Sequence, residues 1–376
     1  MSAIQDDANK TRRKRRGIEG NIADARWSPI SSLNQMNSSS VRAGRRVERD
    51  RMRSLIHDSF GEPAELLHLA DLPTPEPGPG KVRIRTTLSP IHNHDLWTIR
   101  GSYGYKPPLP AIGGSEAVGV VEAVGEGVDA ALLGQRIAVA GVHGSWAEYF
   151  LASPGGLVPV PDAVSDEAAA QLIAMPFSAI SLLEVLSVAE GDWIIQNAAN
   201  GAVGKILAML AKGRGVNTIN LVRRDAGVAE LGALGIDHVV STATPDWKDQ
   251  VRALHGEAPI KAAVDSIGGT SSGDLADLLG ENGLLVSFGS MTGAAMEIPS
   301  GAVIFKQLTL KGFWGTKVSA AMPSDQRRRL IGELLTRAAS GQLELPVEAV
   351  FGLDEASRAV EASLAPGKAG KVLFRP

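Results

Sequence analysis

The sequence contains no cysteine among its 376 residues. This absence excludes disulfides, thiolate nucleophiles, iron–sulfur clusters and every zinc site with cysteine ligands. Only 7 histidines are present, and no two have the i, i+4 spacing of a metal-binding helix. No uncharged apolar run reaches the ~18 residues of a membrane span. We therefore expect a soluble, cytoplasmic protein.

A strong net charge is also missing. The chain carries −3 at pH 7, so we expect neither nucleic acid nor a membrane as partner. The basic residues are uneven, because residues 1–53 hold 13 Lys and Arg against 6 Asp and Glu. Residues 1–51 show no helical or strand periodicity, and their acidic residues argue against a mitochondrial presequence. We interpret residues 1–51 as a disordered basic extension and Met52 as a candidate start.

Two patterns follow this extension. From residue 52 to about residue 160, short strands alternate with turns, which predicts a small β-rich unit. In this unit, residues 135–140 and 146–151 are predicted to form a hairpin. From residue 192, strands alternate with helices of about 8–12 residues, which is typical of a parallel sheet covered on both faces. The fold class predicted is therefore α/β. The predicted strands cover residues 193–198, 217–222, 238–241, 262–267, 284–289 and 308–314; the helices between them cover residues 201–212, 228–234, 246–254 and 272–279.

A glycine-rich turn joins the first of these strands to its helix. Ala199, Gly201 and Gly204 reproduce the A-x-G-x-x-G form of the dinucleotide-binding fingerprint. Gly201 lets the backbone approach a pyrophosphate, and Gly204 lets the helix pack on the sheet. A tight turn of any α/β protein is the alternative, but the consecutive strand–helix repeats favour cofactor binding.

The second strand of the series ends in Arg223 and Arg224. NAD-dependent enzymes carry an acidic residue here to hold the ribose 2′-hydroxyl. A guanidinium group instead matches a 2′-phosphate in charge and geometry. A solvated surface pair is the alternative, and the position favours NADPH as cofactor.

The order of units resembles the medium-chain dehydrogenase/reductase superfamily over residues 52–376. This resemblance implies a GroES-like β-rich catalytic domain at residues 52–173, completed by residues 318–376. It also implies a Rossmann NADP-binding domain at residues 174–317. Zinc-dependent members carry Gly-His-Glu where this chain has Gly114, Ser115 and Glu116. With no cysteine to complete a site, we expect no zinc and place the chain in the zinc-free branch.

Within that branch, the chain looks similar to mitochondrial-type 2-enoyl thioester reductases, with quinone oxidoreductases as the next resemblance. The matching segments are residues 100–104 with Gly113 and Gly114, residues 195–201, and residues 304–314. One position departs from the reductases, because Met175 precedes Pro176 where they carry Asn. The resemblance assigns the pyrophosphate to Asn200, Gly201, Ala202, Val203 and Gly204, the 2′-phosphate to Arg223 and Arg224, the nicotinamide side to Phe288, Gly289, Ser290, Met291, Phe313 and Trp314, and a further cofactor contact to Lys371.

Tyr103 is the predicted catalytic residue. It is one of 3 tyrosines and lies between Ser102 and Gly104, where no core demands an aromatic side chain. Reducing an activated C=C bond needs a donor at the carbonyl that gathers negative charge, and a neutral phenol can supply that hydrogen bond or a proton. Packing within its own loop is the alternative.

These features together predict an NADPH-dependent reductase of 2-enoyl thioesters carried by CoA or ACP. The alternatives are a quinone or enone reductase and, from another class, a non-catalytic NADP-binding protein. In a eukaryote the resemblance implies the mitochondrial matrix. His92, His94 and Asp95 form a tempting metal cluster, but they supply too few suitably spaced ligands. The apolar strand at residues 308–314 predicts a homodimer, because an exposed apolar edge invites pairing.

Overall fold

The computed structural model describes residues 51–376, and its first strand, β1 (Arg51–His57), starts at the first of these residues. The predicted extension over residues 1–51 therefore lies outside the described residues, apart from Arg51. Across the described range, no helix has the length and apolarity that a membrane crossing requires.

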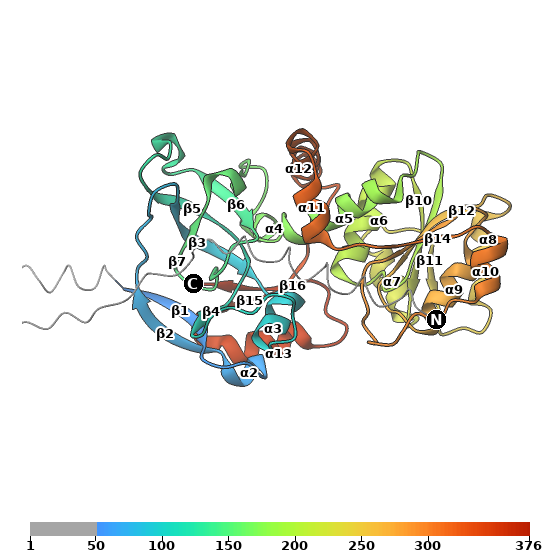
Figure 1. Cartoon of the computed structure of the whole chain (residues 1–376), viewed down its shortest axis with the longest axis horizontal. Coiled ribbons are helices and arrows are strands. Elements are labelled where there is room, and N and C mark those ends of the chain that lie inside the picture. The colour runs from blue at the N-terminus through green and yellow to red at the C-terminus, as the bar shows by residue number, and fades with distance from the viewer. Residues whose placement is uncertain (1–50) are drawn as a thin grey trace, which may run out of the picture. The chain divides into compact units, whose positions relative to one another are not determined.

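A six-stranded, fully parallel sheet forms one part of the molecule (Figure 1). Its strand order is β11-β10-β9-β12-β13-β14, so β9 lies inside the sheet and β14 at one edge. The predicted strands and helices of this part occur in the predicted order, with ends within two residues of those expected. The α/β fold class is confirmed. The strands are β9 (Trp193–Gln196), β10 (Asn217–Val222), β11 (Val239–Ser241), β12 (Ile260–Asp265), β13 (Leu284–Ser287) and β14 (Thr309–Gly312).

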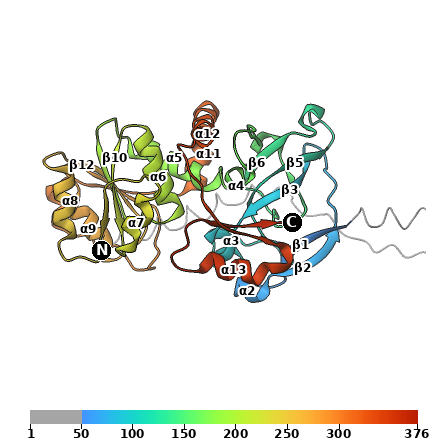
Figure 2. The same ribbon diagram turned by 180° about the vertical axis from the view of Figure 1, so that it is seen from behind.

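Helices cover both faces of the inner strands of this sheet, which is why β9 and β12 are buried without alternation. Ile194 faces one core with α5, α6 and α12, whereas Ile195 faces the other core with α8 and α9. Figures 1 and 2 show α5 and α6 on one side of the sheet and α8, α9 and α10 on the other. These helices are α5 (Ala174–Leu186), α6 (Ala202–Gly213), α7 (Ala226–Gly232), α8 (Trp247–His255), α9 (Thr270–Leu278), α10 (Ser300–Phe305) and α12 (Ser324–Ala339).

The β-rich part contains two further sheets. One has the order β2-β1-β4, and the larger has the order β15-β16-β3-β5-β6-β8, with β7 pairing β3. The C-terminal strand β16 pairs antiparallel with β3, so the end of the chain returns to this part (Figure 1). The strands are β2 (His68–Pro73), β3 (Val82–Pro90), β4 (Ala111–Ile112), β5 (Glu116–Val124), β6 (Arg136–Ala140), β7 (Tyr149–Ala152), β8 (Val158–Pro159), β15 (Val347–Gly352) and β16 (Lys371–Arg375).

The predicted hairpin of residues 135–140 and 146–151 is wrong. Both segments contain strands, but β6 pairs with β5 and β8, whereas β7 pairs with β3. The segment between them contributes Trp146, which is fully buried and donates its indole N–H to the carbonyl oxygen of Pro90 at 3.1 Å. Because the segment before β7 buries this indole, it does not form the tight turn that a hairpin of β6 and β7 would need.

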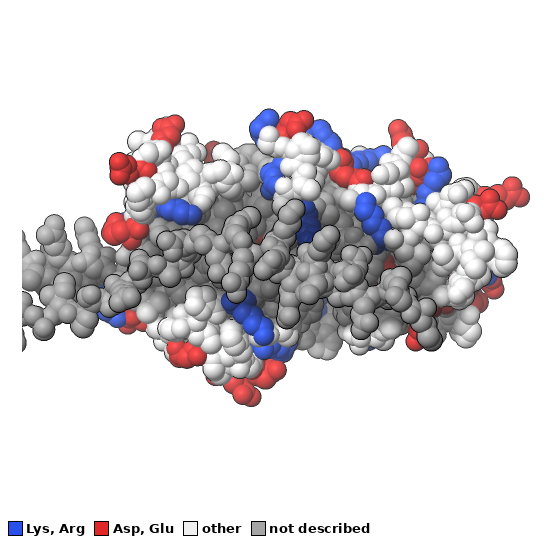
Figure 3. All heavy atoms as spheres, in the orientation of Figure 1, with Lys and Arg blue, Asp and Glu red and all other residues white. Residues whose placement is uncertain are grey.

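Among the other α-helices of the described chain, four are short: α2 (Pro63–Leu66), α3 (Asn93–Ile99), α4 (Asp166–Ala169) and α11 (Gly315–Ala321). A longer helix, α13 (Ala356–Leu364), packs beside α2 and β15. On the face that Figure 3 shows, basic and acidic side chains of the described residues are interspersed. No large patch of one sign is visible among them.

Candidate active site

The loop from β9 to α6 contains the residues predicted to hold a pyrophosphate. A Cβ added at Gly204 would lie 2.8 Å from both Cα and the carbonyl oxygen of Ala199, so only glycine fits there. Ala198 adopts a φ of 50°, and its carbonyl oxygen accepts a hydrogen bond from the N–H of Gly201 at 2.8 Å. Helix α6 begins directly after this turn, and its first N–H groups and dipole favour an anion.

Asn200 lies in the same loop and has an unusual environment. Its side-chain Nδ2 donates to Oε2 of Glu230 at 2.7 Å. Its Oδ1 is buried and accepts no hydrogen bond from any described residue. A buried acceptor without a donor is costly in a folded protein, and a ligand hydroxyl is one group that would satisfy it.

The two arginines predicted for the 2′-phosphate follow β10 and are both exposed. Arg224 forms a loose ion pair, with 3.5 Å between its Nη2 and Oε1 of Glu230. The structure thus brings Arg224 and Asn200 together through one carboxylate. Sequence reasoning missed Glu230, which lies on α7 outside every motif.

Two lysines near this loop were also missed. Lys205 follows Gly204 on α6 and donates from Nζ to the carbonyl oxygen of Ala369 at 2.9 Å. Burial lowers the pKa of Lys205, and the charge of Lys368 lowers it further. Burial also lowers the pKa of Lys368. Glu348 acts against the effect of burial on both lysines, and Glu230 does so on Lys205. A partly desolvated ammonium group gains from a nearby anion.

The residues predicted for the nicotinamide side follow β13 and β14, at the same carboxyl edge of the parallel sheet. The rings of Phe288 and Phe313 are tilted against each other with centroids 5.4 Å apart. Gly289 lies close to the chain, since a Cβ there would be 3.1 Å from the carbonyl oxygen of Ser266. Met291 and Trp314 are 75% and 57% exposed. The edge thus has a packed aromatic pair with two exposed apolar side chains beside it.

A buried carboxylate fixes the ends of β9 and β12 at this edge. Asp265 accepts hydrogen bonds from Nδ2 of Asn197 at 2.7 Å and from Oγ of Ser272 at 2.5 Å. Burial acts to raise the pKa of Asp265, but these hydrogen bonds outweigh it and hold the pKa below its usual value. The carboxylate thereby holds the loops that surround the nucleotide turn.

Tyr103 lies in the loop after α3, beside a chain of hydrogen bonds. The Asp95 carboxylate accepts from the hydroxyl of Ser115 at 2.6 Å and from the backbone N–H of His92 at 3.0 Å. Since Ser115 gives its only hydrogen to Asp95, its oxygen accepts from Nε2–H of His94, 2.8 Å away. The His94 ring lies beside the Tyr103 ring, with centroids 5.7 Å apart. The chain therefore holds the group against which Tyr103 packs.

Glu116 is a fully buried carboxyl group next to this chain. Its Oε1 accepts from the backbone N–H groups of Ile173 at 2.7 Å and Ala174 at 2.8 Å, where α5 begins. Its Oε2 lies 2.7 Å from Nε2 of His92. Burial raises the pKa of Glu116 to about 7 and lowers the pKa of His92 well below its usual value.

Lys371, predicted to contact the cofactor, lies at the start of β16. Its Nζ donates to the carbonyl oxygen of Ile91 at 3.3 Å. Burial lowers the pKa of Lys371 to about 8, although Asp95 and Glu116 act in the opposite direction. The structure therefore groups Lys371 with the residues around Tyr103.

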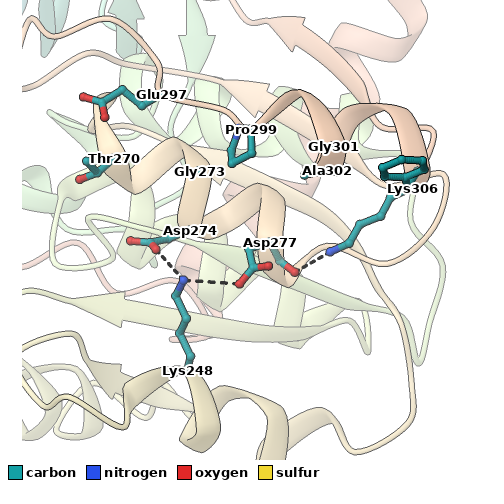
Figure 4. Close-up of a pocket in the computed structure, with 11 residues that line it drawn as sticks. Lys248, Thr270, Gly273, Asp274, Asp277, Glu297, Pro299, Gly301, Ala302 and Lys306 are labelled. Atoms are coloured by element: carbon teal, nitrogen blue, oxygen red, sulfur yellow. Dashed lines mark hydrogen bonds and ion pairs between the residues drawn. The ribbon is translucent and has the colours of Figure 1, made fainter.

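A pocket of about 550 Å³ lies elsewhere, between α9 and α10 (Figure 4). Its two lysines already have partners: Lys248 lies 2.7 Å from Asp274, and Lys306 donates to the backbone carbonyl of Asp277 at 2.5 Å. None of the predicted site residues lines it. We do not assign it to the active site.

Two protein-family models match the chain. The alcohol dehydrogenase GroES-like domain covers residues 78–162, and the zinc-binding dehydrogenase model covers residues 202–330. A curated relative, the mitochondrial enoyl-[acyl-carrier-protein] reductase of Homo sapiens, is 31% identical over 344 residues, or 90% of this chain and 92% of the relative.

Solved structures are similar as well. A putative NADPH:quinone reductase from Bacillus thuringiensis has a TM-score of 0.79 and 28% identity, covering 87% of this chain and 99% of that chain. A mycobacterial protein solved in complex with NADPH has a TM-score of 0.75 and 27% identity, covering 86% of this chain and 100% of that one.

One of the matching models describes a zinc-binding dehydrogenase, and the absence of zinc stays a prediction for this chain. Within residues 51–376, no three His, Cys, Asp or Glu side chains lie together in a way that could hold a metal. Ser115 stands where a zinc-dependent member has histidine, and its hydroxyl is engaged by His94 and Asp95. His92 is likewise engaged by Glu116.

Proposed function

We propose that this chain, which belongs to the medium-chain dehydrogenase/reductase superfamily, reduces the activated C=C bond of 2-enoyl thioesters with NADPH. The observation that carries the proposal is the similarity to a mitochondrial enoyl-[acyl-carrier-protein] reductase over 92% of that relative's length. The chain is an oxidoreductase of this superfamily. Its division into a catalytic domain at residues 52–173 with 318–376 and a Rossmann domain at residues 174–317 is part of the proposal.

The residues at the carboxyl edge of the parallel sheet fit NADPH. The glycine turn and the start of α6 suit the pyrophosphate, since Gly204 admits no side chain and the helix dipole favours an anion. Arg223 and Arg224 suit the 2′-phosphate, with Lys205 as a further cation. The residues after β13 and β14 suit the nicotinamide side. When bound there, NADPH supplies the hydride, and the similar protein solved with NADPH supports this assignment.

Tyr103 supplies the electrophilic assistance in this mechanism. As the β-carbon of the enoyl group is reduced, negative charge develops on the thioester oxygen. The Tyr103 hydroxyl donates a hydrogen bond to that oxygen or gives its proton to the α-carbon. His94 is a positioning residue, because its ring is fixed through Ser115 and packs beside the phenol. Lys371 and Glu116 contribute to the buried polar surroundings.

The test is Tyr103→Phe, assayed with a short-chain 2-enoyl-CoA, with a quinone and by NADPH binding. Loss of one donor should lower kcat on the enoyl thioester by about 10²–10³-fold. Quinones accept electron density on their own oxygens, so their reduction should fall less. NADPH affinity and melting temperature should stay close to wild type, because the ring is retained.

Tyr105→Phe is the matched control. Tyr105 lies two residues away, is 40% exposed and stacks on His143 with centroids 4.5 Å apart. This variant should keep wild-type kcat within about twofold, since exposed substitutions have small effects. An equal, small loss in both variants on both substrates would show that Tyr103 only packs.

The second candidate function is quinone or enone reduction. The similarity to a putative NADPH:quinone reductase favours it. Under this alternative, wild-type turnover with a quinone should exceed that with any enoyl-CoA of short or long chain. Comparing the three acceptors at saturating NADPH decides between the two candidates.

We further propose a homodimer that continues the parallel sheet through β14, an edge strand whose four residues are all exposed. Ile304 and Phe305 lie just before it and are 59% and 83% exposed, and Leu310 on the strand is 46% exposed. An open strand with apolar neighbours is a ready site for pairing. A cellular location in the cytoplasm, or in the mitochondrial matrix of a eukaryote, completes the proposal.

A further inference from the structure

Glu230 of α7 lies among the groups that the proposed NADPH site assigns to the cofactor. Its Oε2 accepts from Asn200 at 2.7 Å, and its Oε1 lies 3.5 Å from the guanidinium of Arg224. Its charge also acts on Lys205, where it raises the pKa against the effect of burial. One carboxylate therefore contacts or influences three residues of the site.

The carboxylate competes with a 2′-phosphate for the same cation. The 3.5 Å pair with Arg224 is loose, and the two side chains are 50% and 37% exposed, so exchange of partners is easy. A phosphate group brings about two negative charges. It would therefore have to draw Arg224 away from Glu230 and also tolerate the nearby carboxylate.

The same carboxylate suits the cofactor that lacks this phosphate. Acidic side chains at the adenosine ribose accept a hydrogen bond from a 2′-hydroxyl. The buried Oδ1 of Asn200, which accepts nothing from the described residues, offers a second acceptor beside Glu230. Both acceptors complement hydroxyl groups and neither complements a phosphate.

We propose that Glu230 is a specificity-determining residue that reduces the preference for NADPH over NADH set by the arginine pair. It does so by occupying Arg224 and repelling the 2′-phosphate, while accepting a hydrogen bond from the 2′-hydroxyl of NADH. This inference rests on the NADPH site of the proposed function. It predicts that the chain uses both cofactors, with discrimination that rises when Glu230 loses its charge.

The experiment is Glu230→Gln in the full-length protein, with dissociation constants for NADPH and NADH measured by calorimetric titration. Glutamine keeps an oxygen that accepts from Asn200, so the loop should stay in place. We expect NADPH to bind about fivefold more tightly, the scale of one exposed charge pair, and NADH to bind no more tightly than to wild type. Melting temperatures check that both proteins are folded.

Two further variants distinguish a specific effect of Glu230 on Arg224 from the effect of removing any one negative charge. Glu281→Gln removes an exposed carboxylate just before β13, at the amino ends of the parallel strands and away from the proposed cofactor site. It should change neither the NADPH nor the NADH dissociation constant. In an Arg224→Gln background, Glu230→Gln should tighten NADPH by less than about twofold, because most of its effect passes through the lost cation.

The outcomes are decisive. If NADPH binds wild type and Glu230→Gln leaves that affinity unchanged or weakens it, Glu230 is neutral or preorganises the site, and the inference fails alone. If wild type does not bind NADPH at all, the proposed cofactor site and the inference fail together.

Discussion

Replacing Glu116 by glutamine should stabilise the protein at neutral and alkaline pH. The wild-type carboxyl group is fully buried, and it caps the start of α5 through the N–H groups of Ile173 and Ala174. Glutamine has the same shape. Its oxygen can accept from both N–H groups, and its amide can donate to Nε2 of neutral His92. The substitution thus removes the cost of a buried negative charge. It also places the imidazole hydrogen on Nδ1 of His92, which has no partner among the described residues, as the protonated wild-type carboxyl group does when it donates to Nε2.

The magnitude follows from the pKa of Glu116, which burial raises from 4.5 to about 7. At about 1.4 kcal/mol for each tenfold change in proton affinity, this rise corresponds to about 3 kcal/mol. Because the folded-state pKa lies above the unfolded-state pKa, the native protein holds this proton more tightly. The stabilisation of the wild-type protein by protonated Glu116 is fully present below pH 4.5 and is lost as the pH rises through about 7.

The assay is urea unfolding at several values between about pH 5 and pH 8, followed by tryptophan fluorescence. The difference in unfolding free energy between Glu116→Gln and wild type should grow with pH by up to about 3 kcal/mol. Glu126→Gln, at an exposed turn position after β5, is the control and should give a flat difference. A difference that stays constant with pH for Glu116→Gln as well would refute the buried-charge argument.

Two other predictions concern assembly and packing. Phe305→Asp should convert the proposed dimer to a folded monomer, because Phe305 is 83% exposed in the described chain and its replacement removes little packing within one protomer. Sedimentation velocity measures the mass, circular dichroism checks the fold, and an unchanged mass would place the interface elsewhere. Arg214→Met should lower the unfolding free energy by about 2 kcal/mol, because the partly buried carboxylates of Glu184 and Glu333 both lose their shared cation at 2.7 Å. Among the described residues, each then keeps only one arginine partner, Arg329 for Glu184 and Arg337 for Glu333. Lys212→Met, which breaks an exposed pair, should cost less than about 1 kcal/mol, and equal losses would contradict this difference.

The parallel sheet could be predicted from sequence because burial on both faces leaves a strong local pattern. Ile194 and Ile195 are adjacent and fully buried in different cores. Such a run, followed by a glycine turn and a helix, indicates a strand of a parallel sheet without any knowledge of its neighbours. The superfamily resemblance, which depended on these motifs, is confirmed.

Strand pairing in the β-rich part could not be predicted in the same way. The alternation of short strands and turns identified the segments of β6 and β7 but carries no information on their partners. β7 pairs with β3, about 65 residues earlier, as the register of Tyr149 with Arg85 shows. Only the packing of the whole sheet selects that partner over the nearer strand.

The hydrogen-bond partners of the polar residues around Tyr103 could not be predicted from sequence for a related reason. His92, His94 and Asp95 drew attention as a metal cluster because they are adjacent in sequence. Their partners Ser115 and Glu116 lie 20 to 24 residues later and give no spacing signal, so the hydrogen-bonded chain is visible only in the fold. Glu230 is an ordinary helix residue until α7 is placed beside the glycine turn.

Glu116 also connects the two halves of the proposed active site. It belongs to β5 beside the chain that holds Tyr103, and it caps α5, which packs on α6 behind the nucleotide turn. A capped helix start is held firmly, because both of its first N–H groups have a fixed acceptor. The path from Tyr103 to the pyrophosphate loop therefore passes through the stacked rings of His94 and His92, the buried carboxyl group of Glu116 and two packed helices. A reaction that needs the β-carbon of the substrate within reach of a nicotinamide depends on this path being short and rigid.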